Sequence, residues 1–481
     1  MSGSPLPTEP AFDYLIISDL HLRGGFNERT EGLYHFDEEL ADLLRYYRLH
    51  RASARPWTLI IGGDLIEFHY VKQLPDLGDP LARGLSFSEE ETRHGPSSEA
   101  LKARWKLDRI LRTSHPQLLL ALARFVAEGN HVVLVRGNHD AELVWPEVQE
   151  HFRRLIAEHH PVDVSYMDMK RAVAERVHFA PWFWYVPGQL YVEHGCQYDP
   201  FCSFEYFLNP VLPADPTRIE NSISDLSIRY FASQVKLVDA MTAESIRSAS
   251  EYLRWLVRGN LMLLPRAFRL YSGMVRRVLA QSGTPDPIAE GAVRATHEER
   301  LRAADALFGV PPGRSAAVHS LHATPIMRST GATARFLGLD LSLAAVVVAV
   351  TAIVVAIAYP ARTALLVFLG VLAIVGAVIY IGTLRVRRIQ EYGHLRRTAE
   401  RVAELFAVPV VVFGHSHRAG LWALPRGAQY FNIGTWIPNV RHAYFVYLAI
   451  TRDGAERDAR LCRWNKSKGE PEPFGVEKVE S

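Results

Sequence analysis

The chain has 481 residues, of which 48% are hydrophobic and 22% are charged, and its formal net charge is only +2. This balance excludes the strongly basic character of chains that bind nucleic acid through their whole surface, so no nucleic-acid partner is expected. The length exceeds that of one ordinary domain and predicts a catalytic unit with a second body.

The N-terminal residues 1–11 lack the charged start and apolar core of a signal peptide, and we predict that they form a disordered tail. The three cysteines of the chain, Cys196, Cys202 and Cys462, have no CxxC spacing. Such a sparse and odd set argues against a disulfide framework and against a thiolate zinc site, so we expect three reduced thiols.

Short apolar runs that read as buried strands recur along the chain, at 14–18, 58–61, 131–135, 190–193 and 408–413. Amphipathic helical patterns, such as residues 36–49 and 117–128, separate several of them. This alternation predicts an α/β layered fold. Three later runs, at 429–433, 443–450 and 459–464, are predicted to complete a mixed sheet or to form a second sheet.

The middle of the chain changes character and is predicted to be a helical insertion at the membrane surface over residues 205–335. Residues 219–281 are helix-like, and a second helical run ends near Leu307. Within the first run, residues 252–281 interleave arginines with Leu, Trp, Phe and Tyr. Such a helix can lie flat among lipid headgroups or can pack on the catalytic domain with a solvated basic face, and the sequence leaves both open.

The most apolar part of the chain is predicted to be a transmembrane hairpin over residues 336–388. Residues 341–359 and 364–384 each contain no charged side chain, and a run of ~20 apolar residues is long enough to cross a bilayer. A buried soluble hairpin is disfavoured because neither run has a polar face. Arg385, Arg387 and Arg388 follow the second run, so the positive-inside rule places the catalytic domain in the cytoplasm, with membrane lipids as partners.

Polar residues follow the five early strands at the point where each strand ends. They are Asp19, His21, Asp64, Asn138, His194, His415 and His417. Carboxylate and imidazole ligands suit Mn²⁺, Fe or Zn²⁺. We predict two divalent metal ions with Asp64 as the bridging carboxylate, because two ions ~3.5–4 Å apart can share a hydroxide and clamp phosphoryl oxygens.

The interval between His194 and His415 is far longer than the other intervals in this set. Because the ligands must still converge, the segment between them has to leave the fold and return. This predicts a catalytic domain in two parts, residues 12–204 and 389–466, with a disordered tail at 467–481. The first helices of the insertion are expected beside the mouth of the site, which favours a lipid-linked phosphoester as substrate.

The motifs resemble the signature blocks of calcineurin-like metallophosphoesterases, in their usual order: Asp19-x-His21, Gly63-Asp64-x-x-Glu67, Gly137-Asn138-His139-Asp140, His194 and Gly414-His415-x-His417. The resemblance implies a four-layer α/β/β/α fold. It implies that one metal takes Asp19, His21, Asp64 and His417, and that the other takes Asp64, Asn138, His194 and His415.

The same resemblance assigns catalytic roles next to the ligands. His139 would contact the phosphate or protonate the leaving oxygen, and Asp140 would orient His139. Arg136 precedes the third block and could contact a phosphate oxygen, with a surface arginine as the alternative.

The nearest branch resembles the UDP-2,3-diacylglucosamine hydrolases, which are cytoplasmic membrane-surface enzymes that cleave a pyrophosphate and typically use Mn²⁺. The resemblance includes Gly434-Thr-Trp436 after a late strand. His139 stands where that branch usually has Arg, and the insertion here is much longer. A phosphorylated small molecule or lipid is therefore the expected substrate, without implying that particular nucleotide lipid.

Two alternatives remain open at this point. A DNA-repair nuclease would share the Gly-Asn-His-Asp block, although the hairpin and the near-neutral charge argue against it. A membrane scaffold without turnover would not need the complete ligand set. The oligomeric state is not predicted.

Overall fold

The computed structural model describes residues 12–475, except for 25–35, 52–54, 235–263, 284, 359, 361–362, 364, 372, 374–375, 377–390, 439–442 and 454–455. The chain divides into two compact units. Unit 1 comprises Met1–Ser245, Pro285–Pro325 and His394–Ser481, and unit 2 comprises Ile246–Thr284 and Ile326–Gly393. Residues 205–335, predicted as one insertion, are therefore shared between the two units. The predicted N-terminal tail lies outside the described residues.

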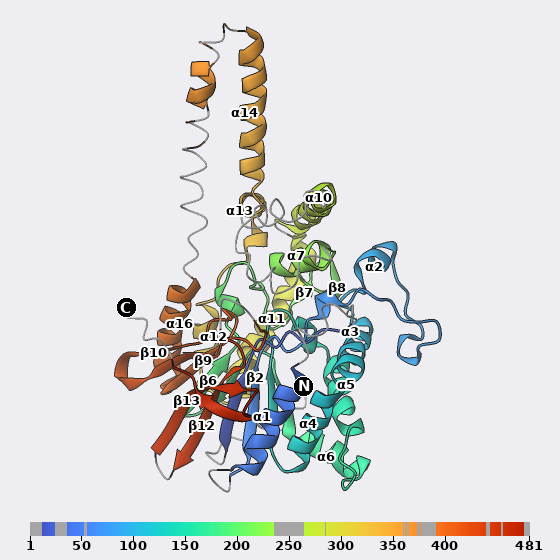
Figure 1. The fold of residues 1–481 in the computed structure, drawn as a ribbon, viewed down its shortest axis with the longest axis vertical. Coiled ribbons are helices and arrows are strands. Elements are labelled where there is room, and N and C mark those ends of the chain that lie inside the picture. Colours follow the sequence, from blue (N-terminus) through green and yellow to red (C-terminus); the bar gives the residue numbers. More distant parts are fainter. Residues whose placement is uncertain are drawn as a thin grey trace. The chain divides into compact units, whose positions relative to one another are not determined.

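The larger sheet of unit 1 has the strand order β14-β13-β12-β1-β2-β3-β4 (Figure 1). Strands β1 to β4 run parallel, whereas β12 pairs antiparallel with β1 and continues into the antiparallel strands β13 and β14. Their bounds are β1 Asp13–Ile17, β2 Trp57–Gly62, β3 His131–Val135, β4 Val177–Ala180, β12 Val446–Asp453, β13 Glu456–Asn465 and β14 Glu470–Pro473.

The second sheet has the order β10-β11-β9-β6-β5, with β9 parallel to both of its neighbours. Its strands are β5 Phe183–Val186, β6 Leu190–Glu193, β9 Val410–Phe413, β10 Gly420–Ala423 and β11 Gln429–Asn432. A small hairpin of β7 Val211–Leu212 and β8 Asp215–Ile219 stands apart from both sheets. The predicted mixed and second sheets are thus both present.

The two sheets pack face to face through one apolar core. Alternate residues of the larger sheet, such as Ile16, Ile60 and Val133, meet Val192 and Val412 of the second sheet, and all are buried. Because side chains alternate across a strand, the other faces of both sheets need their own cover.

Helices supply that cover and complete a four-layer arrangement. Against the larger sheet lie α1 Asp37–Leu49, α3 Ala100–Asp108, α4 Pro116–Ala127, α5 Pro146–Glu158 and α6 Tyr166–Arg176. Helix α1 shows why: Leu40, Leu43, Leu44 and Tyr47 fall on one face and are buried. Against the second sheet lie α11 Pro287–Phe308, α12 Arg314–His319 and α16 Glu391–Phe406. The α/β prediction is confirmed, with mixed sheets.

Shorter helices connect these layers, and some lie next to the loops that hold the predicted site residues. Helix α7, Ile223–Tyr230, packs against the 3₁₀ turn η2, Phe68–Tyr70, which begins directly after Glu67. The other short helices are α2 Glu89–His94, η3 Pro80–Ala82, η4 Arg109–Ser114, η5 Ala141–Val144, η6 Cys196–Tyr198, η7 Ala232–Gln234, η9 Ile326–Arg328 and η10 Pro425–Gly427. The first helix of the predicted insertion therefore lies beside a ligand-bearing loop.

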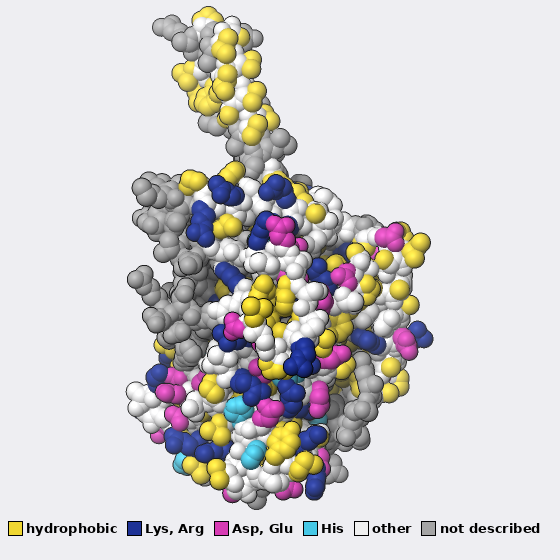
Figure 2. Space-filling view, turned by 90° about the vertical axis from the view of Figure 1, so that its right-hand side faces the viewer, with side chains coloured by type: hydrophobic (Ala, Val, Ile, Leu, Met, Phe, Trp, Pro, Cys, Tyr) yellow, Lys and Arg dark blue, Asp and Glu magenta, His cyan; other side chains and the backbone are white. Residues whose placement is uncertain are grey.

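In unit 2 the structure describes α10 Leu264–Gln281, α13 Thr330–Phe336 and α14 Leu339–Ala358. Helix α10 is fixed to the end of α13 because the Tyr271 hydroxyl donates to the carbonyl of Leu337. On α14, Val346, Val350 and Ile357 are exposed, and Figure 2 shows hydrophobic side chains gathered there. No helix among the described residues has both the length and the apolarity needed to cross a bilayer. The predicted hairpin is therefore unsupported, and much of its second span lies outside those residues.

Two predicted boundaries need correction. The helix-like run 219–281 is interrupted, since β8 ends at Ile219 and α7 ends at Tyr230, while residues 235–263 lie outside the described part. The predicted tail 467–481 contains β14, which pairs with β13. A polar turn makes this hairpin, in which Oδ1 of Asn465 accepts hydrogen bonds from the backbone of Ser467 and Lys468. Its charged and Pro-rich sequence conceals an edge strand.

Candidate metal centre

The predicted ligands converge where the strands of both sheets end. Asp19 and His21 follow β1, Asp64 follows β2, Asn138 follows β3, His194 follows β6, and His415 and His417 follow β9. Short contacts join residues from distant parts of the chain. The Asp19 carboxylate accepts a hydrogen bond from the backbone of His415 at 3.1 Å, and its Oδ1 lies 3.1 Å from Nε2 of His417. The last block of the sequence therefore meets the first.

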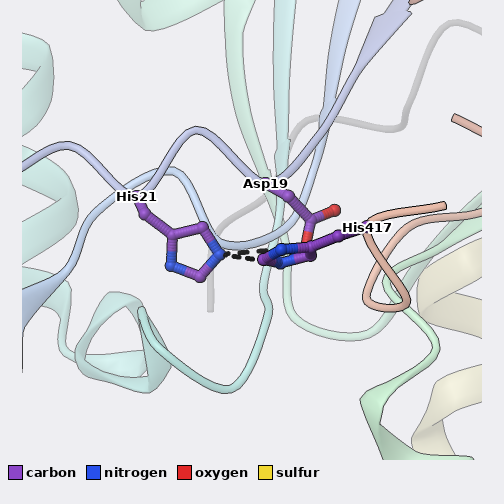
Figure 3. Close-up of side chains that lie close together, drawn as sticks. All are labelled: Asp19, His21 and His417. Atoms are coloured by element: carbon purple, nitrogen blue, oxygen red, sulfur yellow. Dashed lines mark hydrogen bonds and ion pairs between the residues drawn. The ribbon is translucent and has the colours of Figure 1, made fainter. Parts of the chain in front are cut away.

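Asp19, His21 and His417 form the first donor group, with one ligand atom from each residue within 4.8 Å of the others. Figure 3 shows the rings of His21 and His417 with their Nε2 atoms facing each other, 3.2 Å apart, beside the Asp19 carboxylate. Two imidazole nitrogens at this distance need a proton or a cation between them. A metal ion would satisfy both lone pairs and the carboxylate together.

Asp64 connects this group to a second one. Its Oδ2 lies 3.7 Å from Nε2 of His21 and 3.1 Å from Nε2 of His194. Asp19, Asp64 and His194 again offer ligand atoms within 4.8 Å of one another. A carboxylate between two imidazoles from different strands is the arrangement that a bridging ligand requires.

Buried polar atoms without hydrogen bonds provide the test of whether these residues suit a metal. Neither Oδ1 nor Nδ2 of Asn138 has a partner among the described residues, although the side chain is fully buried. Oδ1 of Asp19 and Nε2 of His194 also lack a hydrogen bond of good geometry there, although each lies 3.1 Å from another side chain of the site. Leaving one such group unpaired costs ~1–3 kcal/mol, so several in one site indicate a missing ligand. The donors fit divalent cations.

The imidazoles of two ligands are held by their second ring nitrogen. Nδ1 of His194 lies 2.9 Å from the carbonyl of Gly62, and Nδ1 of His21 lies 3.3 Å from Oε2 of Glu67. Each contact fixes the tautomer that keeps the proton on Nδ1. The lone pair of each Nε2 is then directed to the site, as is usual for histidines that bind metals.

The backbone at the ligands is strained in a consistent way. Positive φ angles occur at Asp19 (54°), His21 (46°), Asp64 (52°), His415 (65°) and His417 (56°). Residues other than glycine seldom adopt this left-handed conformation, and where they do the cost is ~1–3 kcal/mol each. Five such residues at three strand ends indicate that the surrounding sheets impose the ligand geometry.

Comparison with known proteins agrees with this geometry. Residues 12–225 match the sequence model of the calcineurin-like phosphoesterase family. The chain contains a calcineurin-like phosphoesterase domain. It is accordingly a metal-dependent phosphoric ester hydrolase, and the family binds divalent metals. No curated protein matches the chain. The matched residues include five of the predicted ligands, and the fold of the hydrolase adds His415 and His417 to them.

The hydrolase orients His139 with a residue other than the predicted one. Nδ1 of His139 lies 2.9 Å from Oε2 of Glu67, and its Nε2 lies 3.9 Å from Oδ2 of Asp64. Asp140 instead accepts hydrogen bonds from the backbone of Gly137 and Leu65, at 2.7 and 2.8 Å. The predicted role of Asp140 is therefore wrong, because its carboxylate ties the loops after β2 and β3 together.

The charges of the site hold protons on imidazoles and keep them off carboxylates. Burial opposes ionisation of Asp64, but His194 and His139 outweigh it and lower the pKa of the carboxyl. Burial also disfavours protonated His139, yet Glu67 and Asp64 raise its pKa to about 9. The pKa of His194 likewise rises to about 9 beside Asp64 and Asp19. Bound cations would act against both imidazole shifts and displace the His194 proton.

Arg136 was predicted either to contact a phosphate oxygen or to lie on the surface. Only 2% of the residue is exposed, so the surface alternative is wrong. Its guanidinium stands 4.3 Å above the Phe207 ring, and Nη2 donates to the Phe207 carbonyl. Contact with a phosphate stays a prediction. Phe207 belongs, with Trp182, Tyr198 and Phe204, to the apolar core that covers the outer face of the second sheet.

Proposed function

We propose that the hydrolase cleaves a phosphoester at two divalent metal ions, with Mn²⁺ favoured and Fe or Zn²⁺ as alternatives. The observation that carries the proposal is the place of Asp64 between two imidazole groups, 3.7 Å from His21 and 3.1 Å from His194. One ion would take Asp19, His21, Asp64 and His417. The other would take Asp64, Asn138, His194 and His415.

When bound, the ions would activate water and neutralise charge on the phosphoryl group. The residues of the chain supply the rest. Glu67 and Asp64 favour the protonated form of His139, and Glu67 occupies its Nδ1 side. The Nε2–H is then directed to the site, where it can donate to a phosphoryl oxygen or to the leaving oxygen.

Metal content and turnover together test this proposal. Purified protein loaded with Mn²⁺ should contain two ions per chain by elemental analysis, and it should hydrolyse bis-p-nitrophenyl phosphate. Asp64→Ala should lose at least one ion and the activity, whereas Glu147→Gln, on the exposed face of α5, should keep both. A protein that binds two ions but turns over no phosphoester would favour the scaffold, and digestion of duplex ends would favour the nuclease.

We further propose that unit 2 attaches the enzyme to a membrane, with the catalytic unit in the cytoplasm. On α14, Val346, Val347, Val350, Ile353, Val354 and Ile357 are all 46% exposed or more. Soluble surfaces seldom carry so large an apolar patch without a partner. Helix α10 adds Arg266, Arg269 and Arg276 on its exposed side and contains no acidic residue. Arginines on such a helix suit anionic headgroups.

A membrane-attached phosphoesterase favours a lipid-linked or nucleotide-linked substrate, including the pyrophosphates cleaved by the branch that the motifs resemble. Detergent-solubilised enzyme assayed against lipid phosphates, nucleotide-linked lipids and free nucleotides would rank these classes by kcat/KM. Membrane attachment has its own test, because full-length protein should float with vesicles that contain anionic lipid. Val350→Asp with Ile353→Asp should abolish flotation while turnover of bis-p-nitrophenyl phosphate continues.

A further inference from the structure

The imidazole of His415 faces a carboxylate that lies outside the sequence motifs. Nε2 of His415 is 3.1 Å from Oδ2 of Asp199, and both side chains are largely buried, with 13% and 17% of their surfaces exposed. Asp199 follows the turn η6, which itself follows His194. The ring of His415 lies 5.3 Å from the ring of His194, so the contact is next to the second donor group.

The carboxylate of Asp199 is held rigidly for this contact. Its Oδ1 accepts a hydrogen bond from the backbone of Phe201 at 2.9 Å. Its main-chain carbonyl accepts from the backbone of Cys202 and Ser203, at 3.1 and 2.8 Å. These bonds close a turn that leaves Oδ2 directed at His415. One carboxylate oxygen, Oδ1, therefore belongs to the turn, and the other, Oδ2, contacts the imidazole.

The other ligand imidazoles indicate what such a contact does. His194 gives its Nδ1 to the Gly62 carbonyl and His21 gives its Nδ1 to Glu67, which leaves Nε2 for the metal in each case. At His415 the contact is on Nε2. An Nε2–H that donates to Asp199 leaves the lone pair on Nδ1, so His415 would use the opposite ring nitrogen from His194 and His21.

We propose that Asp199 is a positioning residue that keeps the proton of His415 on Nε2 and presents Nδ1 to the second metal ion. The inference rests on the proposed dinuclear function. It also links the metal centre to the start of the long segment that separates His194 from His415. The competing arrangement is a separate three-ligand site, since Asp199, Cys202 and His415 offer ligand atoms within 4.8 Å of one another.

The coordination of His415 can be observed directly. In protein labelled with ¹⁵N-histidine and loaded with Zn²⁺, the imidazole nitrogen couplings should show His415 bound through Nδ1 and protonated at Nε2. Assignment is made by the loss of its signals in His415→Gln. Binding through Nε2 would overturn the proposal, and this measurement does not depend on any Asp199 variant being stable.

Variants of Asp199 test its contribution to metal affinity by calorimetry. Asp199→Ala should lower the affinity for the second Mn²⁺ by about 10–100-fold and leave the affinity for the first unchanged. Asp199→Asn, whose amide oxygen can still accept from Nε2–H, should recover part of this loss. If Asp199→Ala bound each ion as tightly as the wild type does, the positioning role would be refuted, provided that circular dichroism shows both proteins to be folded. A wild-type protein that binds fewer than two ions would instead refute the dinuclear function.

Cys202 provides the matched control. Cys202→Ala should bind both ions as the wild type does, because its thiol belongs to the turn and not to the metal. Co²⁺-loaded wild-type protein should then lack the near-ultraviolet thiolate band. A band that disappears in Cys202→Ala would establish the separate three-ligand site and overturn the positioning role.

Discussion

Oε2 of Glu67 lies 2.9 Å from Nδ1 of His139, and the same oxygen lies 3.3 Å from Nδ1 of His21. One carboxylate thus serves a predicted metal ligand and the predicted proton donor. Glu67→Gln should lower kcat by about 10–100-fold, since the positions of both imidazoles depend on it. It should also move the alkaline limb of the kcat profile to lower pH, because Glu67 raises the pKa of His139. An unchanged limb, with Glu147→Gln as control, would contradict this role.

The metal-free enzyme should become less stable as the pH rises from about 6.5 to about 9. His139 and His194 have folded pKa values of about 9 against 6.5 for the free side chain, so the folded state binds more protons in this range. Their stabilisation is complete below the unfolded pKa and is lost through the folded pKa. Thermal unfolding of protein treated with EDTA measures it. A Tm that climbs across this window would contradict the assignment, and loading with Mn²⁺ should flatten the slope.

Gly137→Ala should abolish metal binding at the bridge and reduce activity by at least about 100-fold. A Cβ at Gly137 would stand 2.1 Å from Oδ1 of Asp64 and 2.6 Å from its backbone nitrogen, so the carboxylate that we propose as the bridge would have to move. Such a small displacement of a reacting group is known to be costly. Gly291→Ala is the control, because its Cβ would meet no atom within 4 Å and a helix interior favours alanine. Elemental analysis and turnover of both variants decide the outcome.

Glu142→Ala should destabilise the catalytic unit by about 3–5 kcal/mol, since it removes the ion-pair partner of the buried Lys106. Nζ of Lys106 lies 3.2 Å from Oε1 of Glu142, and each side chain is only 1% exposed. Urea unfolding measures the loss. Asp42→Ala removes the exposed pair with Arg45 and should cost at most about 1 kcal/mol. Equal effects of the two variants would show that burial of the first pair is unimportant.

The sequence predicted which side chains would converge because each follows an apolar strand, and strand ends of parallel sheets meet at one edge. That these side chains bind metal stays a prediction. Asp19 and His415 are a clear example, since neither their separation in sequence nor the long segment between them prevents their hydrogen bond. Roles that depend on the direction of a side chain were harder to predict from the sequence. Both Asp140 and Glu67 stand near His139, and only their rotamers decide which carboxylate reaches the ring.

Other features have no local signal in the sequence. Asp199 sits in an irregular turn after His194, and nothing in the pattern of neighbouring residues points to His415 as its partner. Strand β14 was hidden by its charged and Pro-rich sequence, which is typical both of edge strands and of tails. Only the hairpin turn that begins at Asn465 distinguishes an edge strand from a tail here.

Strand β9 occupies the middle of the second sheet, between β6 and β11, although it is made long after β6. During synthesis the edge of β6 that later pairs with β9 therefore stays unpaired until the whole intervening segment has emerged from the ribosome. An open apolar edge is prone to pair with other chains, so the late closure exposes the growing polypeptide to such pairing until β9 is made. The pairing of β9 that covers this edge also brings in His415 and His417, so the nascent chain closes its second sheet and completes the predicted ligand set in one event.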